Sequence, residues 1–196
     1  MTYSAINADL FRAINDLGKQ LEFLNPIMVV IAEYFVYLLG LYVVVCWFTR
    51  NRRNKLMVIS SVMAFGIAEI IGKLVGKLYA NNQPFAELSD VNQLIEHAID
   101  NSFPSDHSIL FFSFCFTFIF FKKKPAILWA VIAIIVAISR VWVGVHYPGD
   151  VTAGALIGIA SAWIASLIVP KPQFVHKLLG IYEKFEQKII PARKSA

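Results

Sequence analysis

Five long apolar stretches constrain what this chain can fold into more than any other feature. They occupy residues 26–48, 56–79, 105–121, 125–144 and 150–169. A helix needs about 20 mostly apolar residues to cross the hydrocarbon core of a bilayer. We therefore expect an all-α protein, a polytopic membrane helix bundle with five transmembrane helices. The third stretch is the shortest, and it reaches spanning length only if its helix begins near Ser105.

Composition supports this class of protein. Hydrophobic residues make up 58% of the chain and charged residues 16%, whereas soluble domains are about 45–50% apolar and about 25% charged. So apolar a chain excludes a disordered protein and argues against a soluble one. The net charge of +5 suits contact with anionic headgroups or phosphate but is too diffuse for nucleic acid. Cys46 and Cys115 lie in apolar stretches and indicate no disulfide framework.

The charges of the connecting segments predict an orientation. Residues 50–55, 122–124 and the tail 170–196 are rich in Lys and Arg, whereas the loop 80–104 carries acidic residues and neither Lys nor Arg. Basic loops stay in the cytoplasm. We therefore expect the N-terminus, the loop 80–104 and the turn 139–150 to lie outside, and the C-terminal tail to lie inside.

Both ends of the chain have apolar residues at helical spacing. These residues are Ile6, Leu10, Ile14, Leu17, Leu21 and Leu24 at one end, and Phe174, Leu178, Tyr182, Phe185 and Ile189 at the other. A lysine-rich side next to an apolar side is typical of a helix lying on an anionic inner leaflet. We expect one domain, 1–196: an interfacial segment 1–25, a five-helix core 26–169 with the outer loop 80–104, and a basic amphipathic cytoplasmic tail 170–196.

Reactive side chains gather at the outer ends of the third to fifth stretches. Residues 103–107 read Phe-Pro-Ser-Asp-His, and residues 139–150 hold Arg140, His146 and Asp150. Helix N-termini bind anions, and a guanidinium grips phosphate oxygens in a bidentate manner. If the turn at His146 is helical, the carboxylate four residues on can hold one ring nitrogen and leave the other free to attack. The pattern predicts a phosphate pocket with a nucleophilic histidine.

These motifs resemble those of the type 2 phosphatidic acid phosphatase superfamily. Ser139-Arg140, five residues, His146, three residues and Asp150 resemble its third motif. The run 104–107, Pro-Ser-Asp-His, resembles its second motif, in which Gly usually stands at the place of Asp106. The small size, the five expected spans and the outward site are most similar to bacterial undecaprenyl-diphosphate phosphatases of the bacitracin-resistance type.

The resemblance implies roles for the motif residues. His146 would attack the terminal phosphorus and become a phosphohistidine, Asp150 would orient it, and His107 would protonate the departing oxygen and later activate water. The residues implied to hold the phosphoryl oxygens are Arg140, Ser105, Ser139 and Asp106, the last through its backbone N–H. Positioning and cations stabilise the charge of phosphoryl transfer, so we expect no metal and no cofactor.

The first motif of the family, Lys, six residues and Arg-Pro, departs from its usual form. Gln83-Pro84 stands at the Arg-Pro position, and Gly76 stands where the lysine belongs. Lys73 and Lys77 lie on one face of the second stretch. We expect Lys77, nearer the outer end, to supply the missing phosphate contact, with Lys73 as the deeper candidate and Gln83 contributing a neutral hydrogen bond.

The expected function is hydrolysis of undecaprenyl diphosphate to undecaprenyl phosphate in the bacterial plasma membrane, which recycles the carrier for envelope synthesis. The rivals are a phosphatidylglycerophosphate or phosphatidic acid phosphatase, a transporter or flippase that uses the intramembrane Glu and Lys residues, Glu33 and Glu69 among them, and a structural protein with a dead site. Glu69 has a packing alternative, an ion pair with Lys73 one turn away. Expected partners are the lipid substrate and membrane lipids; no nucleic acid and no obligate protein partner is indicated.

Overall fold

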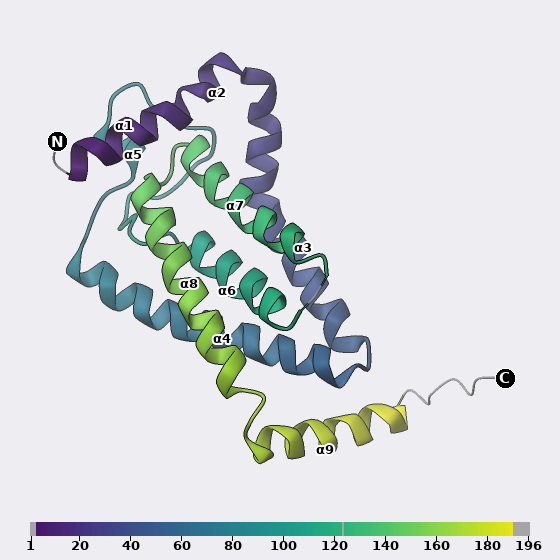
Figure 1. Cartoon of the computed structure of the whole chain (residues 1–196). Coiled ribbons are helices and arrows are strands. Elements are labelled where there is room, and N and C mark those ends of the chain that lie inside the picture. Colours follow the sequence, from purple (N-terminus) through teal and green to yellow (C-terminus); the bar gives the residue numbers. More distant parts are fainter. Residues whose placement is uncertain (1–2, 123, 190–196) are drawn as a thin grey trace.

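The computed structural model describes residues 3–122 and 124–189, and all regular structure in these two ranges is helical (Figure 1). The expected all-α architecture is confirmed. Lys123 and residues 190–196 of the predicted basic segments lie outside the described residues. The helices are α1 Tyr3–Asn15, α2 Leu17–Gln20, a 3-10 turn Glu22–Leu24, α3 Asn25–Phe48, α4 Arg52–Leu78, α5 Pro84–Glu87, α6 Asp106–Phe120, α7 Ala126–Trp142, α8 Pro148–Ile168 and α9 Gln173–Ile189.

Each of the five apolar stretches forms one long helix, but the helices differ in length. Within the described ranges, three have the length and composition to cross a membrane: Glu22–Phe48, which includes α3, then α4 and α8. The helices α6 and α7 are apolar but shorter, with 15 and 17 residues. The protein is thus a membrane-embedded helical bundle, and the number of five spans stays a prediction.

Helix α6 lies at the centre of the bundle, between α4, α7 and α8 (Figure 1). Gly154 of α8 allows a close approach to α6: a Cβ atom there would lie 2.7 Å from the carbonyl oxygen of Ser105. The N–H of Ser105 in turn donates to the carbonyl oxygen of Asp150, at 3.2 Å. Small residues let helix backbones come close together in membrane bundles. This contact sets the N-termini of α6 and α8 side by side.

The N-terminal helix α1 packs across the ends of α7 and α8. Phe11 and Asn15 are fully buried, and the Asn15 amide donates to the carbonyl oxygens of Trp142 and Asn92, at 2.8 and 3.0 Å. On its other side α1 exposes Ile6 and Leu10, and α2 exposes Leu17. The segment predicted as interfacial therefore contributes to the protein core, and its exposed apolar side remains available to lipid.

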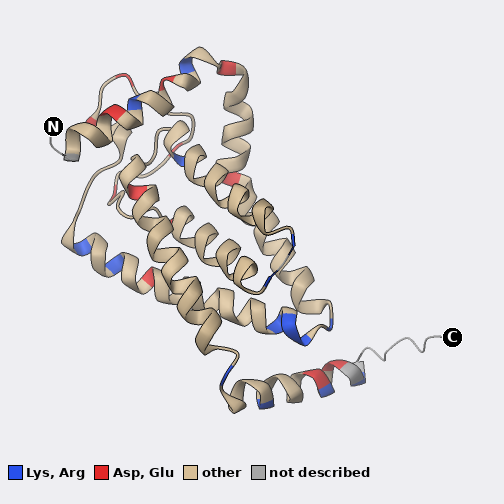
Figure 2. Cartoon of the chain, in the orientation of Figure 1, with Lys and Arg blue, Asp and Glu red and all other residues tan. Residues whose placement is uncertain are grey.

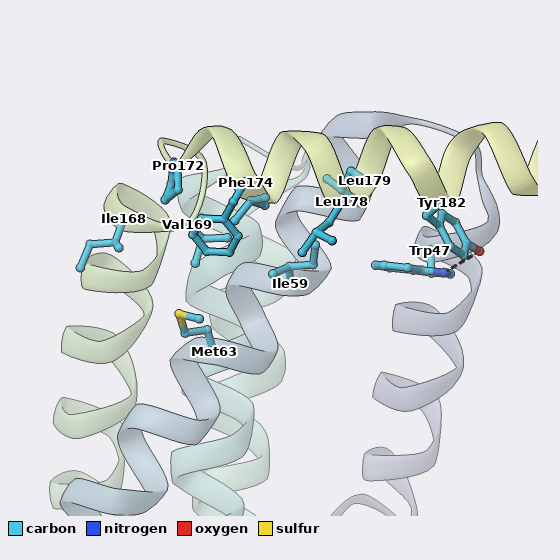
Figure 3. A pocket seen from close by; sticks show the side chains of 11 residues that line it. Trp47, Ile59, Met63, Ile168, Val169, Pro172, Phe174, Leu178, Leu179 and Tyr182 are labelled. Carbon is cyan, nitrogen blue, oxygen red and sulfur yellow. Dashed lines mark hydrogen bonds between the residues drawn. The ribbon is translucent and has the colours of Figure 1, made fainter.

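Helix α9 closes the opposite end of the bundle. Lys55, fully buried at the start of α4, forms an ion pair with Glu186 of α9, at 2.5 Å between Nζ and Oε2. The indole N–H of Trp47 donates to the hydroxyl of Tyr182, at 2.9 Å (Figure 3). Beneath α9 lies an apolar cavity of about 460 Å³, whose walls include Ile59 and Met63 of α4 and Ile168 of α8. The amphipathic tail helix predicted from the sequence is present.

The charges of the connecting segments differ between the two ends of the bundle. Figure 2 shows Lys and Arg at the turn between α3 and α4 and acidic residues in the loop beside α1, whereas α1 and α9 carry charges of both signs. The guanidinium of Arg53 donates to the carbonyl oxygen of Phe121, at 2.7 Å, so the two basic connections lie together. The segregation that the sequence predicted along the chain is therefore also a segregation in space.

Candidate active site

The short connection between α7 and α8 places His146 beside the outer loop. The ring is 6% exposed, and its Nδ1 lies 3.0 Å from the carbonyl oxygen of Ser102. A carbonyl can only accept, so Nδ1 carries the proton and Nε2 keeps its lone pair. Burial lowers the pKa of His146, although the negative charge of Asp150 opposes that effect. The ring is therefore held neutral, with one nitrogen anchored and the other available.

Asp150 lies in the first turn of α8 and is 1% exposed. Its Oδ2 accepts from the backbone N–H of Tyr147, at 2.8 Å, and from the hydroxyl of Ser102. The carboxylate thus caps the positive end of α8. The same oxygen lies 3.7 Å from Nδ1 of His146. The predicted pair is brought together, with α8 beginning at Pro148 and His146 just ahead of the helix.

Arg140 lies in the last turn of α7 and is 1% exposed. Its Nη1 donates to the carbonyl oxygen of Ala32, at 3.2 Å, and lies 3.5 Å from Oε1 of Glu33 on α3. Its buried Nε has no hydrogen-bond partner among the residues described. An unsatisfied charged donor is costly inside a protein, and a phosphate oxygen is an acceptor that suits it.

The start of α6 supplies the second motif. Ser105 is the N-cap, and its hydroxyl oxygen accepts from the N–H of Ser108 at 3.5 Å. Asp106 opens the helix and is exposed, and the half-buried His107 follows within electrostatic range of Arg140 and His146. Both predicted histidines therefore belong to one cluster, which lies against the N-termini of α6 and α8.

Ser139 is buried, but its hydroxyl donates to the carbonyl oxygen of Val136 within α7, at 2.7 Å. That bond commits the proton of the hydroxyl to the helix itself. The hydroxyl of Ser139 could therefore offer a phosphate only its lone pairs. The phosphate oxygens are themselves mainly acceptors at neutral pH, so such a contact is unfavourable. The side chain is better suited to fixing the last turn of α7, which carries Arg140.

Among the hydrogen bonds and ion pairs found in the described residues, none joins Lys73, Lys77 or Gln83 to the cluster. Lys73 is 77% exposed in its side chain and lies 3.9 Å from Glu69, and Lys77 is also exposed. Gln83 is buried, and both ends of its amide bond Asp100: Nε2 donates to the carboxylate, and Oε1 accepts from the N–H at 3.1 Å. A phosphate contact by Gln83 would require it to release Asp100.

Gly76 explains why the family lysine is missing. A Cβ atom at this position would lie 2.7 Å from the carbonyl oxygen of Phe103 and 3.1 Å from the amide of Asn101. The Asn101 amide also donates to the carbonyl oxygen of Gly76, at 2.9 Å. The backbone of α4 and the loop before α6 are so close that no side chain fits between them.

Three residues of the site were not predicted from the sequence to belong to it. Ser102 contacts His146 and Asp150, Glu33 lies against Arg140, and the ring of His97 lies 6.3 Å from that of His146, centroid to centroid, edge to face. A signal existed for Ser102, because it ends a polar run, Asp-Asn-Ser, directly before the second motif. Among the side chains described, no group of three or more His, Cys, Asp or Glu could hold a metal ion.

A neutral imidazole with a free lone pair, beside a buried guanidinium at the end of an apolar bundle, is what a membrane-embedded phosphatase requires. The comparison with protein families agrees. The chain belongs to the PAP2 superfamily, whose profile matches residues 55–174. The expected resemblance is thereby confirmed, and the protein is a hydrolase of this family.

Two relatives and one solved structure show how far the similarity extends. The chain is 54% identical to the bacitracin transport permease protein BcrC of Bacillus licheniformis, over all of this chain and 97% of that protein. It is 29% identical to the undecaprenyl-diphosphatase BcrC of Bacillus subtilis, over 94% and 95% of the two chains. The crystal structure of LpxE from Aquifex aeolicus has the same fold, with a TM-score of 0.69 and 24% identity over 82% of this chain and 94% of that one.

Proposed function

We propose that this protein hydrolyses undecaprenyl diphosphate to undecaprenyl phosphate and inorganic phosphate at the outer face of the bacterial plasma membrane. The observation that carries the proposal is the state of His146, whose Nδ1 is anchored so that Nε2 keeps its lone pair, within electrostatic range of Arg140. Further support comes from the relative in Bacillus subtilis, which is named as an undecaprenyl-diphosphatase.

The reaction has two steps. Nε2 of His146 attacks the terminal phosphorus, the bond from phosphorus to the bridging oxygen breaks, and His107 gives a proton to that oxygen as undecaprenyl phosphate departs. A water molecule then attacks the phosphorus of the phosphohistidine, His107 takes its proton, the bond from phosphorus to Nε2 of His146 breaks, and inorganic phosphate is released. Arg140, with N–H groups at the start of α6, stabilises charge on the transferred oxygens. Asp150 stabilises the imidazolium.

The sidedness of the site is part of this proposal. All described basic connections gather at the end of the bundle that α9 covers, and the site lies at the other end (Figure 2). Because basic segments remain in the cytoplasm, the site faces outward. An exposed cysteine at Ser89 should react with an impermeant thiol reagent in intact cells, and one at Lys124 should not. Both native cysteines are buried, so they should contribute little background labelling. The reverse labelling would place the site in the cytoplasm.

Transport is the second candidate, because the 54% identical relative is named as a bacitracin transport permease. A transporter needs no nucleophile. The two functions therefore differ in their dependence on His146. Bacitracin resistance that survives in cells carrying His146→Ala would favour transport, whereas its loss together with phosphatase activity favours hydrolysis.

The decisive experiment is phosphate release by the purified protein in detergent. It compares undecaprenyl diphosphate, phosphatidylglycerophosphate and phosphatidic acid, each with and without a chelator. We expect the diphosphate to be hydrolysed fastest, without effect of the chelator. His146→Ala should lose essentially all turnover, whereas His107→Ala should still form phosphohistidine from a substrate with a good leaving group. A His146→Ala protein with wild-type turnover would refute the mechanism, and a preference for either phospholipid would reassign the substrate.

A further inference from the structure

Ser102 contacts both members of the His146–Asp150 pair. It is a fully buried serine in the outer loop. Its hydroxyl donates to Oδ2 of Asp150 and lies 3.2 Å from Nδ1 of His146, and its carbonyl oxygen lies 3.0 Å from the same nitrogen. Its own N–H donates to the carbonyl oxygen of Asn81, at 2.7 Å. The residue is thus fixed on one side by the loop and holds two side chains on the other.

The direct contact between those two side chains is long. Nδ1 of His146 lies 3.7 Å from Oδ2 of Asp150, whereas an N–H···O hydrogen bond measures about 2.7–3.2 Å. The proton on Nδ1 goes to the Ser102 carbonyl, and the carboxylate receives the Ser102 hydroxyl instead. Asp150 therefore acts on the ring through its field and through Ser102.

We propose that Ser102 is a positioning residue for the reaction proposed above. Its carbonyl oxygen fixes the Nδ1–H tautomer of His146, so that the attacking lone pair is on Nε2. Its hydroxyl holds the carboxylate of Asp150 at the place where its charge stabilises the imidazolium. Ser102 touches only the Nδ1 side of the ring, opposite the reacting nitrogen, so the role is positioning and not catalysis. The inference rests on the proposed function, because it needs His146 as the nucleophile.

The hydroxyl also sets how much negative charge faces the ring. Without it, Oδ2 of Asp150 keeps only the N–H of Tyr147 as a donor. The less compensated carboxylate then favours the protonated imidazole, which raises the pKa of His146. The other charged or titratable groups that face this ring are Arg140 from α7, His107 from α6 and His97 from the outer loop. None of them contacts the Ser102 hydroxyl in the hydrogen bonds found, so its removal changes the carboxylate first.

The test compares Ser102→Ala, Ser102→Thr and Ser113→Ala in the full-length protein, with undecaprenyl diphosphate as substrate. Ser113 is the matched control, because it is a buried serine of α6 whose hydroxyl has no partner within the part of the chain described. We expect Ser102→Ala to lower kcat roughly ten- to hundred-fold with little change of KM. The acidic limb of its pH profile should move to higher pH. Ser102→Thr retains the hydroxyl and should recover both the kcat and the pH profile of the wild type. Ser113→Ala should match the wild type.

A second readout does not depend on turnover. Titration of the His146 imidazole, followed by NMR, should give a higher midpoint in Ser102→Ala than in the wild type. Equal midpoints, or a Ser102→Ala protein with wild-type kcat and pH profile, would overturn the role. A Ser102→Thr protein as slow as Ser102→Ala would assign the effect to loop packing and also overturn it. Absence of phosphate release by the wild type would instead refute the proposed function, and the titration would still test Ser102.

Discussion

The guanidinium of Arg140 lies 3.5 Å from the carboxylate of Glu33, which joins the last turn of α7 to the first half of α3. This pair orients Arg140, a buried cation of the candidate site. It also assigns a structural task to Glu33, an acidic residue within an otherwise apolar helix. Such residues in membrane segments are costly and are usually paired.

Arg140→Lys should therefore impair catalysis while the charge is kept. A lysine has no planar fork for bidentate binding of phosphate, and loss of a charge-assisted hydrogen bond costs about 1.5–3 kcal/mol. We expect kcat/KM to fall roughly ten- to hundred-fold, measured as phosphate release. Glu33→Gln keeps the shape of the partner and should cost less, because Glu33 is 45% exposed in its side chain. A larger loss in Glu33→Gln than in Arg140→Lys would contradict this division of roles.

The pH profile should report the state of His146. Burial lowers the pKa of this ring, and the free imidazole value is about 6.5. The neutral form is the nucleophile, so activity persists as the pH falls through 6.5 and is lost only below it. We expect the acidic limb of kcat/KM to lie under that value. The limb should persist in His107→Ala when phosphohistidine formation is measured. A midpoint at or above 6.5 would show that burial does not govern the ring.

Gly76 should resist even the smallest substitution. The Cβ of Gly76→Ala would meet the Phe103 carbonyl at 2.7 Å, and forced overpacking costs about 1–3 kcal/mol, more than the helix preference of Ala over Gly returns. Gly66 of the same helix is the control, since nothing lies within 4 Å of its Cβ position. In thermal denaturation in detergent, Gly76→Ala should lower the Tm and Gly66→Ala should leave it unchanged or raise it. Equal Tm values would refute the close approach.

Lys77 is predicted to supply the phosphate contact that the family lysine makes elsewhere. Lys77→Met should lower kcat/KM for the diphosphate roughly ten- to hundred-fold, the value of one charge-assisted contact. Lys73→Met is the matched control on the same helix, and its effect should be smaller because Lys73 lies one turn further from the outer end of α4 and pairs with Glu69. The opposite ranking in folded proteins would move the role to Lys73.

Glu186 should be needed for the stability of the bundle. Glu186→Gln leaves the ammonium of the fully buried Lys55 without its anion, and breaking a buried pair from one side costs about 3–5 kcal/mol. Glu183→Gln is the control, because its partner Arg52 is 43% exposed. We expect a clear fall of the Tm for Glu186→Gln and a much smaller one for Glu183→Gln. Similar Tm values for both would show that Lys55 reaches water.

The long helices could be predicted from the lengths of the apolar stretches, because a chain segment in lipid has to satisfy its backbone hydrogen bonds internally and therefore forms a helix. The predicted stretch 26–48 became α3 Asn25–Phe48, and 150–169 became α8 Pro148–Ile168. The cluster of His107, Arg140 and His146 followed from motif spacing. Ser102 and Glu33 could not be found in this way, because their partners come from helices distant in sequence. From the sequence alone, Gly76 is only a position where the family lysine is absent. The structure adds that the backbone of Phe103 leaves no room for a side chain there.

The contact between Lys55 and Glu186 joins residues 131 positions apart in the chain. Ribosomal synthesis delivers the lysine long before the glutamate exists. During that interval the ammonium has no anion from α9, so it has to stay with water or headgroups while the later helices insert. The end of the bundle that α9 covers is therefore completed only after Glu186 has been made, and a chain released before that point would lack the α9 side of the apolar cavity.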